Sequence, residues 1–175
     1  MKAQSGPESL LARIGTWAGW LNLPLIALMV IDVLLRKCFA ITATWVLELE
    51  WHLFAVIFLL GIPYALQQDR HVRVDLFYEK FAPRDRALVD LLGGLLFLLP
   101  WAAVLLYTGS RYAWSAFRSG EGSPNPGGIP LFWPIKLMIP FMALLLFIQG
   151  VLQISKAYRI WAGTQEQCSP NEEVT

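Results

Sequence analysis

The residues best suited to acid–base, redox or metal chemistry are two histidines, His52 and His71, and two cysteines, Cys38 and Cys168. A catalytic acid and base must reach the same substrate, and a disulfide requires two adjacent sulfur atoms. His52 and His71 lie at opposite ends of one apolar segment, where nineteen helical positions would separate them by about 28 Å. In the membrane arrangement derived below, Cys38 and Cys168 fall on opposite sides of the bilayer. Neither pair is therefore predicted to act together.

Glu48 and His52 are four residues apart, so both lie on one face of a predicted helix. Zinc sites usually need three or four protein ligands, and a haem held by two histidines needs them to face each other inside the membrane. We therefore favour a hydrogen bond at the membrane interface, or a contact with a partner, over a metal site. The sequence also lacks a P-loop, a G-x-S-x-G and an H-E-x-x-H motif. No catalytic residue, metal site or cofactor is expected, and the chain is predicted not to be an enzyme.

The overall composition indicates what kind of element positions these residues. Of 175 residues, 56% are hydrophobic and 15% are charged, and the 13 glycines raise the apolar share to about 63%, against about 45–50% in soluble domains. A soluble domain of this size could not cover so much apolar surface. With a net charge of +1 and two cysteines, the chain fits neither a disordered protein nor a disulfide scaffold. The remaining class is an integral membrane protein.

Four apolar stretches are long enough to cross the roughly 30 Å hydrocarbon core of a bilayer as helices. The predicted spans cover residues 17–35, 47–66, 88–108 and 135–155. None alternates with the period of two that a membrane barrel requires. The predicted fold is an all-α integral membrane protein with four transmembrane helices, in one domain over residues 1–163. The polar tail at residues 164–175 is expected to be disordered.

Apolar residues also recur at helical spacing ahead of the first span. Leu10, Leu11, Ile14 and Trp17 follow this spacing, with Arg13 among them. Two interpretations are equally open. One is a short amphipathic helix that lies in the membrane interface, and the other is an extension of the first span with a frayed end.

The distribution of basic residues indicates the orientation of the four spans. Four spans place both termini and the middle loop on one side, which carries nine of the 14 lysines and arginines, against five on the other side. Cytoplasmic loops are enriched in such residues. Both termini are therefore predicted to be cytoplasmic, and the loop at residues 119–130 is predicted to lie outside.

The spans hold few groups that could bind or move a solute. Asp32 lies near the end of its span with Arg36 four residues on, which predicts an ion pair. Gln149 and Gln153 share one helix face, where they would hydrogen-bond to neighbouring helices. No ionisable residue stands at the centre of a span, where its charge would cost about 3 kcal/mol or more. Each span instead contains one proline, which predicts a local bend: Pro24, Pro63, Pro100 and Pro140.

Three stretches of the chain follow a shared pattern of motifs. The second span opens with WVLELEW and leads into FLLGIPYALQQDRHVRVDLFYEKFAP, in which a glycine precedes H-x-x-V-D-x-F. The third loop and fourth span read SGEGSPNPGGIPLFWPIKLMIPFMALLLFIQGVLQ, with the motif G-E-x-S-x-N-x-G-G-I-P-x-x-W-x-I-K. In this order and spacing, from Trp17 to Gln153, the chain resembles the small membrane subunit of tripartite ATP-independent periplasmic (TRAP) transporters.

This resemblance implies a subunit of an importer in the cytoplasmic (inner) membrane of a bacterium or archaeon. In such importers a periplasmic binding protein captures the solute, and a large polytopic subunit moves it with sodium. The small subunit would be a static scaffold beside the large one, with membrane lipids around it and no nucleic acid. The third-loop motif is most similar to the branch that serves organic acids.

The motifs also imply which residues contact a partner subunit or lipid. Arginines at a cytoplasmic membrane boundary would meet anionic headgroups, and Glu121 is a candidate contact for the binding protein. The predicted contact residues are Glu50, Trp51, His71, Arg73, Asp75, Glu121, Ser123, Pro130, Trp133 and Lys136.

Two other functions stay open at this point. One is a membrane anchor for an electron-transfer enzyme. The lack of facing histidines that could hold a haem argues against it. The other is a small self-sufficient channel or carrier, which would need several copies of the chain around a polar pore.

Overall fold

The structure, a computed structural model, describes residues 6–68 and 82–167 as a set of long helices. His71, Arg73 and Asp75 lie outside the described residues. In chain order the helices are α1 (Pro7–Trp20), α2 (Asn22–Phe39), α3 (Thr44–Gln67), α5 (Pro83–Gly93), the π-helical turn η1 (Gly94–Leu98), α6 (Leu99–Ser119) and α7 (Trp133–Gln167). They form four arms long and apolar enough to cross a membrane. The prediction of an all-α fold with four long apolar helices is confirmed, while its orientation in the membrane stays a prediction.

The four arms extend beyond the spans expected from hydropathy. They cover Glu8–Phe39, Thr44–Gln67, Arg84–Ser119 and Trp133–Gly163. Hydropathy marks only the part of a helix that lies in hydrocarbon, and polar residues continue these helices past it. Helix α7 runs to Gln167, so residues 164–167 are helical where a disordered tail was expected. Residues 168–175 lie outside the described part of the chain.

The helix ahead of the first span packs lengthwise against α3. The chain bends at Leu21, between α1 and α2, where the Asn22 side chain donates a hydrogen bond to the Gly19 carbonyl at 2.9 Å. A β-carbon added at Gly15 of α1 would lie 2.3 Å from the Tyr64 ring of α3, so this ring packs directly on the α1 backbone. Of the two interpretations, this arrangement fits an extension of the first span, and the extension is ordered by α3 rather than frayed.

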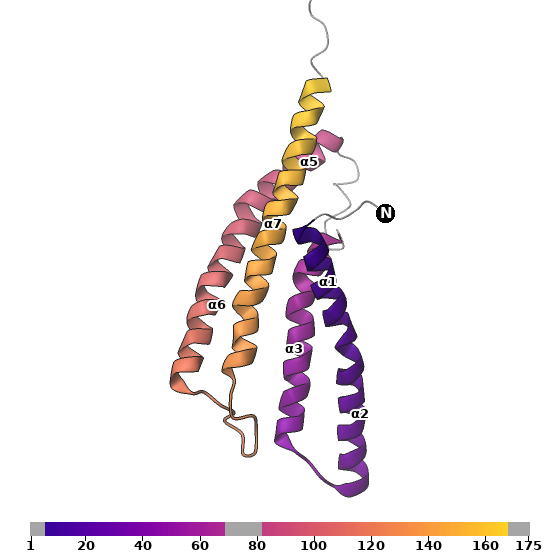
Figure 1. Cartoon of the computed structure of the whole chain (residues 1–175), viewed down its shortest axis with the longest axis vertical. Helices are drawn as coiled ribbons and strands as arrows, with labels where there is room; N and C mark the ends of the chain where they lie inside the picture. The colour runs from indigo at the N-terminus through magenta and orange to yellow at the C-terminus, as the bar shows by residue number, and fades with distance from the viewer. Residues whose placement is uncertain (1–5, 69–81, 168–175) are drawn as a thin grey trace, which may run out of the picture.

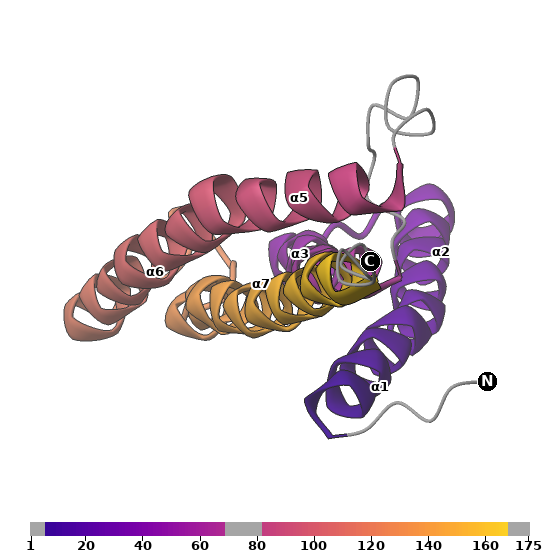
Figure 2. The same ribbon diagram turned by 90° about the horizontal axis from the view of Figure 1, so that it is seen from above.

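The arms form two helical hairpins, one of α1–α2 with α3 and one of α5–α6 with α7 (Figure 1). The arms alternate in direction. One end of the molecule therefore holds the start of α1, the end of α3, the start of α5 and the end of α7. We call this the terminal end, and the opposite end, with residues 40–43 and 120–132, the loop end. Figure 2 shows α7 between the α5–α6 arm and the other hairpin, and α7 contacts α3, α5 and α6.

Small residues allow α6 to approach α7 closely. Ala102, Gly109, Ala113 and Ala116 are buried at spacings of seven, four and three residues, which places them on one helix face. A β-carbon at Gly109 would come within 3.0 Å of the Ile139 side chain. Close backbone approach through small residues is a common way to join helices in a membrane. Ala102 of this seam also belongs to a buried apolar cluster with Leu66, Met142 and Leu146.

Two of the four prolines lie in the first turn of a helix, and the other two lie inside a helix. Pro24 and Pro100 lie in the first turns of α2 and α6, directly after the bend at Leu21 and the π-turn η1. A proline has no N–H to donate to the preceding turn, which explains why the helix path changes there. Pro63 and Pro140 lie inside α3 and α7, and both are buried.

Candidate functional site

The loop from Gly120 to Phe132 folds back on itself at the loop end of the molecule. Gly120 takes a left-handed conformation (φ 60°), and the Glu121 N–H donates to the Ala116 carbonyl at 3.1 Å, which ends α6 with a standard glycine cap. Across the loop, the Phe132 N–H donates to the Glu121 carbonyl at 2.8 Å and the Ser123 N–H to the Ile129 carbonyl at 2.9 Å. These bonds give residues 121–132 a fixed shape.

The Glu48 carboxylate of α3 holds this loop. The side chains of Ser123 and Asn125 both donate to its Oε1, the latter at 3.1 Å, and the Ile129 N–H donates to Oε2 at 2.6 Å. Glu48 is only 4% exposed, so the three loop donors replace the water that its charge would otherwise need. We call Glu48 with Ser123, Asn125 and Ile129 the clasp. It joins the two hairpins at the loop end.

Two glycines make room for the clasp. A β-carbon at Gly128 would lie 2.3 Å from the Ser123 hydroxyl and 2.6 Å from Glu48 Oε2. A β-carbon at Gly122 would lie 2.5 Å from the Pro130 carbonyl oxygen. Gly128, the last glycine of the G-E-x-S-x-N-x-G-G motif, is therefore needed for space around the carboxylate, and Gly122, which the motif leaves open, lets the two sides of the loop approach each other.

A second polar contact fixes the other edge of the loop. Lys136 Nζ, at the start of α7, lies 2.6 Å from Glu121 Oε2 and 4.1 Å from the centre of the Tyr112 ring of α6. Lys136 is buried, whereas the Glu121 side chain is 44% exposed. Ring contacts add to this, with His52 against Phe132 at 5.2 Å between ring centres.

The structure brings together some of the predicted contact residues and separates others. Glu121, Ser123 and Lys136 meet in or beside the clasp, and Ser123 and Lys136 already have partners within the chain. Trp133 packs edge-on against the Phe117 ring at 5.5 Å, and Pro130 is exposed on the loop. That any of these residues contacts another subunit stays a prediction.

Glu50 and Trp51 make none of the clasp bonds. Glu50 is buried, and its Oε1 has no hydrogen-bond partner among the described residues, whereas Trp51 is 70% exposed. The sequence-based set of site residues omitted Glu48 and Asn125, which make clasp bonds. Two signals pointed to them: Glu48 shares a helix face with His52, and Asn125 belongs to the third-loop motif.

A different polar contact joins the hairpins at the terminal end. Lys156 Nζ of α7 lies 2.7 Å from the Glu8 carboxylate of α1, and the Gln67 side chain of α3 donates to the Glu8 carbonyl at 2.6 Å. We call these contacts the terminal tie. Gln149 is buried as predicted for a polar residue between helices, but its Oε1, like that of Gln153, has no partner among the described residues.

The predicted ion pair at the end of the first span is present, because Arg36 contacts the buried Asp32 carboxylate. Within residues 6–68 and 82–167, no group of three or more histidine, cysteine or acidic side chains is placed to hold a metal ion.

Comparison with known families identifies the family of this chain. Residues 25–160, well over half of the chain, match the family described as tripartite ATP-independent periplasmic transporters, DctQ component. The chain belongs to this family. DctQ proteins are the small membrane components of TRAP transporters and are not enzymes. A search of curated proteins finds no match to the chain.

Membership in the DctQ family confirms the resemblance drawn from the motifs and sets aside the electron-transfer anchor. It implies a TRAP complex with a DctM subunit and a periplasmic binding protein. DctQ components are multi-pass membrane proteins, typically of the inner membrane.

Proposed function

We propose that this DctQ component is a static scaffold in a sodium-coupled importer of an organic acid. It braces the large subunit in the membrane while that subunit moves the solute. The observation that supports this most is the clasp, because a buried carboxylate bonded to three groups of the other hairpin resists relative movement of the hairpins. The organic acid is inferred from the third-loop motif alone.

The distribution of charge also favours a scaffold over a self-sufficient channel. The middle of each arm lacks any charged residue, over positions 14–31, 53–66, 91–110 and 137–155. Ion and substrate pathways in membranes usually contain such groups near the centre. The solute path is therefore assigned to the large subunit.

We further propose that the loop end faces the periplasm and offers part of the surface on which the binding protein docks. The excess of basic residues at the other end supports this orientation. Glu121 and Pro130 are exposed on a loop that the clasp holds in one shape, and a preformed surface binds without the cost of ordering it.

Co-expression tests the scaffold proposal. The full chain, tagged, is expressed with a DctM-type large subunit, and solute uptake is measured with and without the chain. We expect the two subunits to purify together and uptake to be lost without the small one. Failure to co-purify, or full uptake in its absence, would overturn the proposal.

The two natural cysteines test the orientation. Cys38 is exposed near the loop end, and Cys168 belongs to the opposite end of the sequence. In intact spheroplasts, a membrane-impermeant maleimide should label the Cys168→Ser variant, which keeps Cys38, but not Cys38→Ser. Cys168 should react only after the membrane is opened. The reverse pattern would place the loop end in the cytoplasm.

A further inference from the structure

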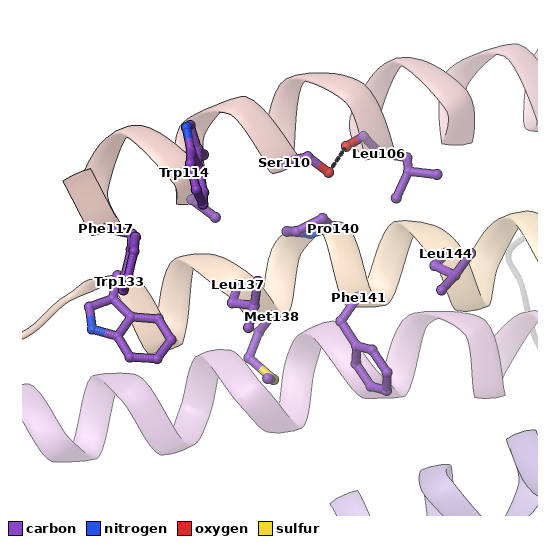
Figure 3. A pocket seen from close by; sticks show the side chains of 11 residues that line it. Leu106, Ser110, Trp114, Phe117, Trp133, Leu137, Met138, Pro140, Phe141 and Leu144 are labelled. Carbon is purple, nitrogen blue, oxygen red and sulfur yellow. Dashed lines mark hydrogen bonds between the residues drawn. The ribbon is translucent and has the colours of Figure 1, made fainter.

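An apolar groove lies between α6 and α7 near the loop end, on a face that the clasp does not use. It has a volume of about 560 Å³, within the range of about 300–1,000 Å³ typical of ligand sites. Figure 3 shows Trp114, Phe117 and Trp133 toward one end of the groove and Leu106 and Leu144 toward the other.

The interior of the groove offers almost no hydrogen bonds to a ligand. The Ser110 hydroxyl, which lines it, already donates to the Leu106 carbonyl at 2.6 Å (Figure 3). Pro140 and Phe141 add apolar surface on the α7 side. Such a groove suits a hydrocarbon chain.

The length of the groove matches one leaflet of a bilayer. From Trp133 to Leu144 it follows eleven positions of α7, which at 1.5 Å each is about 17 Å. Half of a hydrocarbon core of about 30 Å is about 15 Å. Trp114 and Trp133 stand at the end where tryptophans usually meet the headgroup region. A packed partner helix would follow the whole arm, whereas this groove ends at Leu144, about a third of the way along α7.

Two exposed cations of α6 lie on the same helix face as Trp114, which lines the aromatic end of the groove. Tyr107, Arg111, Trp114 and Arg118 follow one another at spacings of four, three and four residues, so they form one stripe on the helix. The Arg118 guanidinium lies 5.5 Å from the Trp114 ring and that of Arg111 lies 5.8 Å from the Tyr107 ring, and both arginines are exposed.

Neither arginine is neutralised by an acidic side chain in the described part of the chain. The acidic partners of Arg36, Lys136 and Lys156 are Asp32, Glu121 and Glu8, and none of these three ion pairs includes Arg111 or Arg118. An arginine held on an aromatic face at the membrane surface is well suited to bind a phosphate, because its planar donors match phosphate oxygens.

We propose that this groove binds a membrane phospholipid, with one acyl chain along the seam of α6 and α7 and the phosphate on Arg118. The apolar lining, the one-leaflet length and a cation at the aromatic end that no acidic side chain of the described residues neutralises all fit this one ligand. The lipid fills the surface between the two helices and stays bound when the surrounding lipid exchanges.

Native mass spectrometry of the full chain in detergent, with added phosphatidylglycerol, tests the acyl site. Leu144 and Val151 both lie on α7 with similar exposure, 42% and 45%, but only Leu144 lines the groove. Leu144→Trp should reduce lipid retention about tenfold, as expected for about two methylenes displaced from an apolar surface. Val151→Trp should retain lipid like the unchanged chain. Equal retention by both variants would overturn the proposal.

The phosphate contact is tested by Arg118→Gln. Lys37→Gln is the control, because Lys37 is also an exposed cation near the loop end but lies on another helix, α2. Arg118→Gln should weaken retention several-fold and Lys37→Gln should not. If Leu144→Trp fails to fold, as judged by gel filtration and circular dichroism, the comparison of Arg118→Gln with Lys37→Gln still tests the lipid site. Equal behaviour of Arg118→Gln and Lys37→Gln would contradict the proposed phosphate site.

Cross-linking in the complex distinguishes a lipid from a partner helix. A phosphatidylglycerol with a diazirine on its acyl chain is added to proteoliposomes that contain the chain with its large subunit. We expect label on the peptide of α7 that holds Met138 and Phe141. Label on α2 and α3 as strong as that on α7, or no label on α7 because the large subunit covers it, would overturn the proposal.

Discussion

The loop end and the terminal end join the same two hairpins by different means. At the loop end, the buried Glu48 carboxylate accepts bonds from Ser123, Asn125 and a backbone N–H. At the terminal end, Lys156 pairs with Glu8, with their side chains 58% and 19% exposed. Water and salt compete with the second contact but reach the first one little. The clasp should therefore determine how the hairpins are fixed, and the terminal tie should matter less.

The largest effect is expected from Glu48→Ala. It leaves three donors of the loop without their acceptor, and unmet buried donors are costly. We expect the Tm of the purified chain, followed by tryptophan fluorescence, to fall by about 5 °C or more.

Glu50→Ala is the matched control for Glu48→Ala. Glu50 is also a buried glutamate of α3, but its Oε1 has no partner among the described residues. Its replacement should lower the Tm far less. A similar loss in both variants would show that any buried carboxylate of α3 matters equally, contrary to the clasp.

An intermediate effect is expected from Gly128→Ala. The added methyl group must displace the Ser123 hydroxyl or the Glu48 carboxylate, and overpacking of this kind costs about 1–3 kcal/mol. Gly61→Ala is the control, because a β-carbon there has nothing within 4 Å. Thermal unfolding should show a loss for Gly128→Ala and no loss for Gly61→Ala. If both variants unfold like the unchanged chain, the loop is looser than its hydrogen bonds indicate.

The smallest effect is expected from Lys156→Ala in the terminal tie. An exposed ion pair contributes less than about 1 kcal/mol, and high salt should remove even that difference. The Tm of Lys156→Ala and of the unchanged chain is compared in low and high salt. A loss as large as that of Glu48→Ala would reverse the ranking of the two ends.

The sequence allowed contacts within a helix to be predicted better than contacts between helices. Asp32 and Arg36 are four residues apart, so the helix itself brings them together. The bonds of Glu48 instead join residues 75 to 81 positions apart. They exist only because the loop folds to a shape that depends on Gly122 and Gly128. Hydropathy predicts that both hairpins form, but not which donors the loop turns toward α3.

Hydropathy also does not predict where the helices begin and end. Helix α1 is ordered by contact of Gly15 with Tyr64 and of Gln67 with Glu8, which no local pattern encodes. The buried alanines and glycine of α6 likewise look unremarkable in sequence, and their role depends on the neighbouring α7.

A distance measurement across the two hairpins in the working complex tests the scaffold most directly. Spin labels are placed at Cys38 of α2 and at Ser119→Cys of α6, both exposed near the loop end, in a Cys168→Ser background with the large subunit present. Double electron–electron resonance then gives the distribution of distances between the two labels, with and without sodium and the solute-loaded binding protein. The scaffold account predicts one narrow distribution that does not change. A distribution that shifts or splits when sodium and solute are added would show that the hairpins move during transport, and would contradict it.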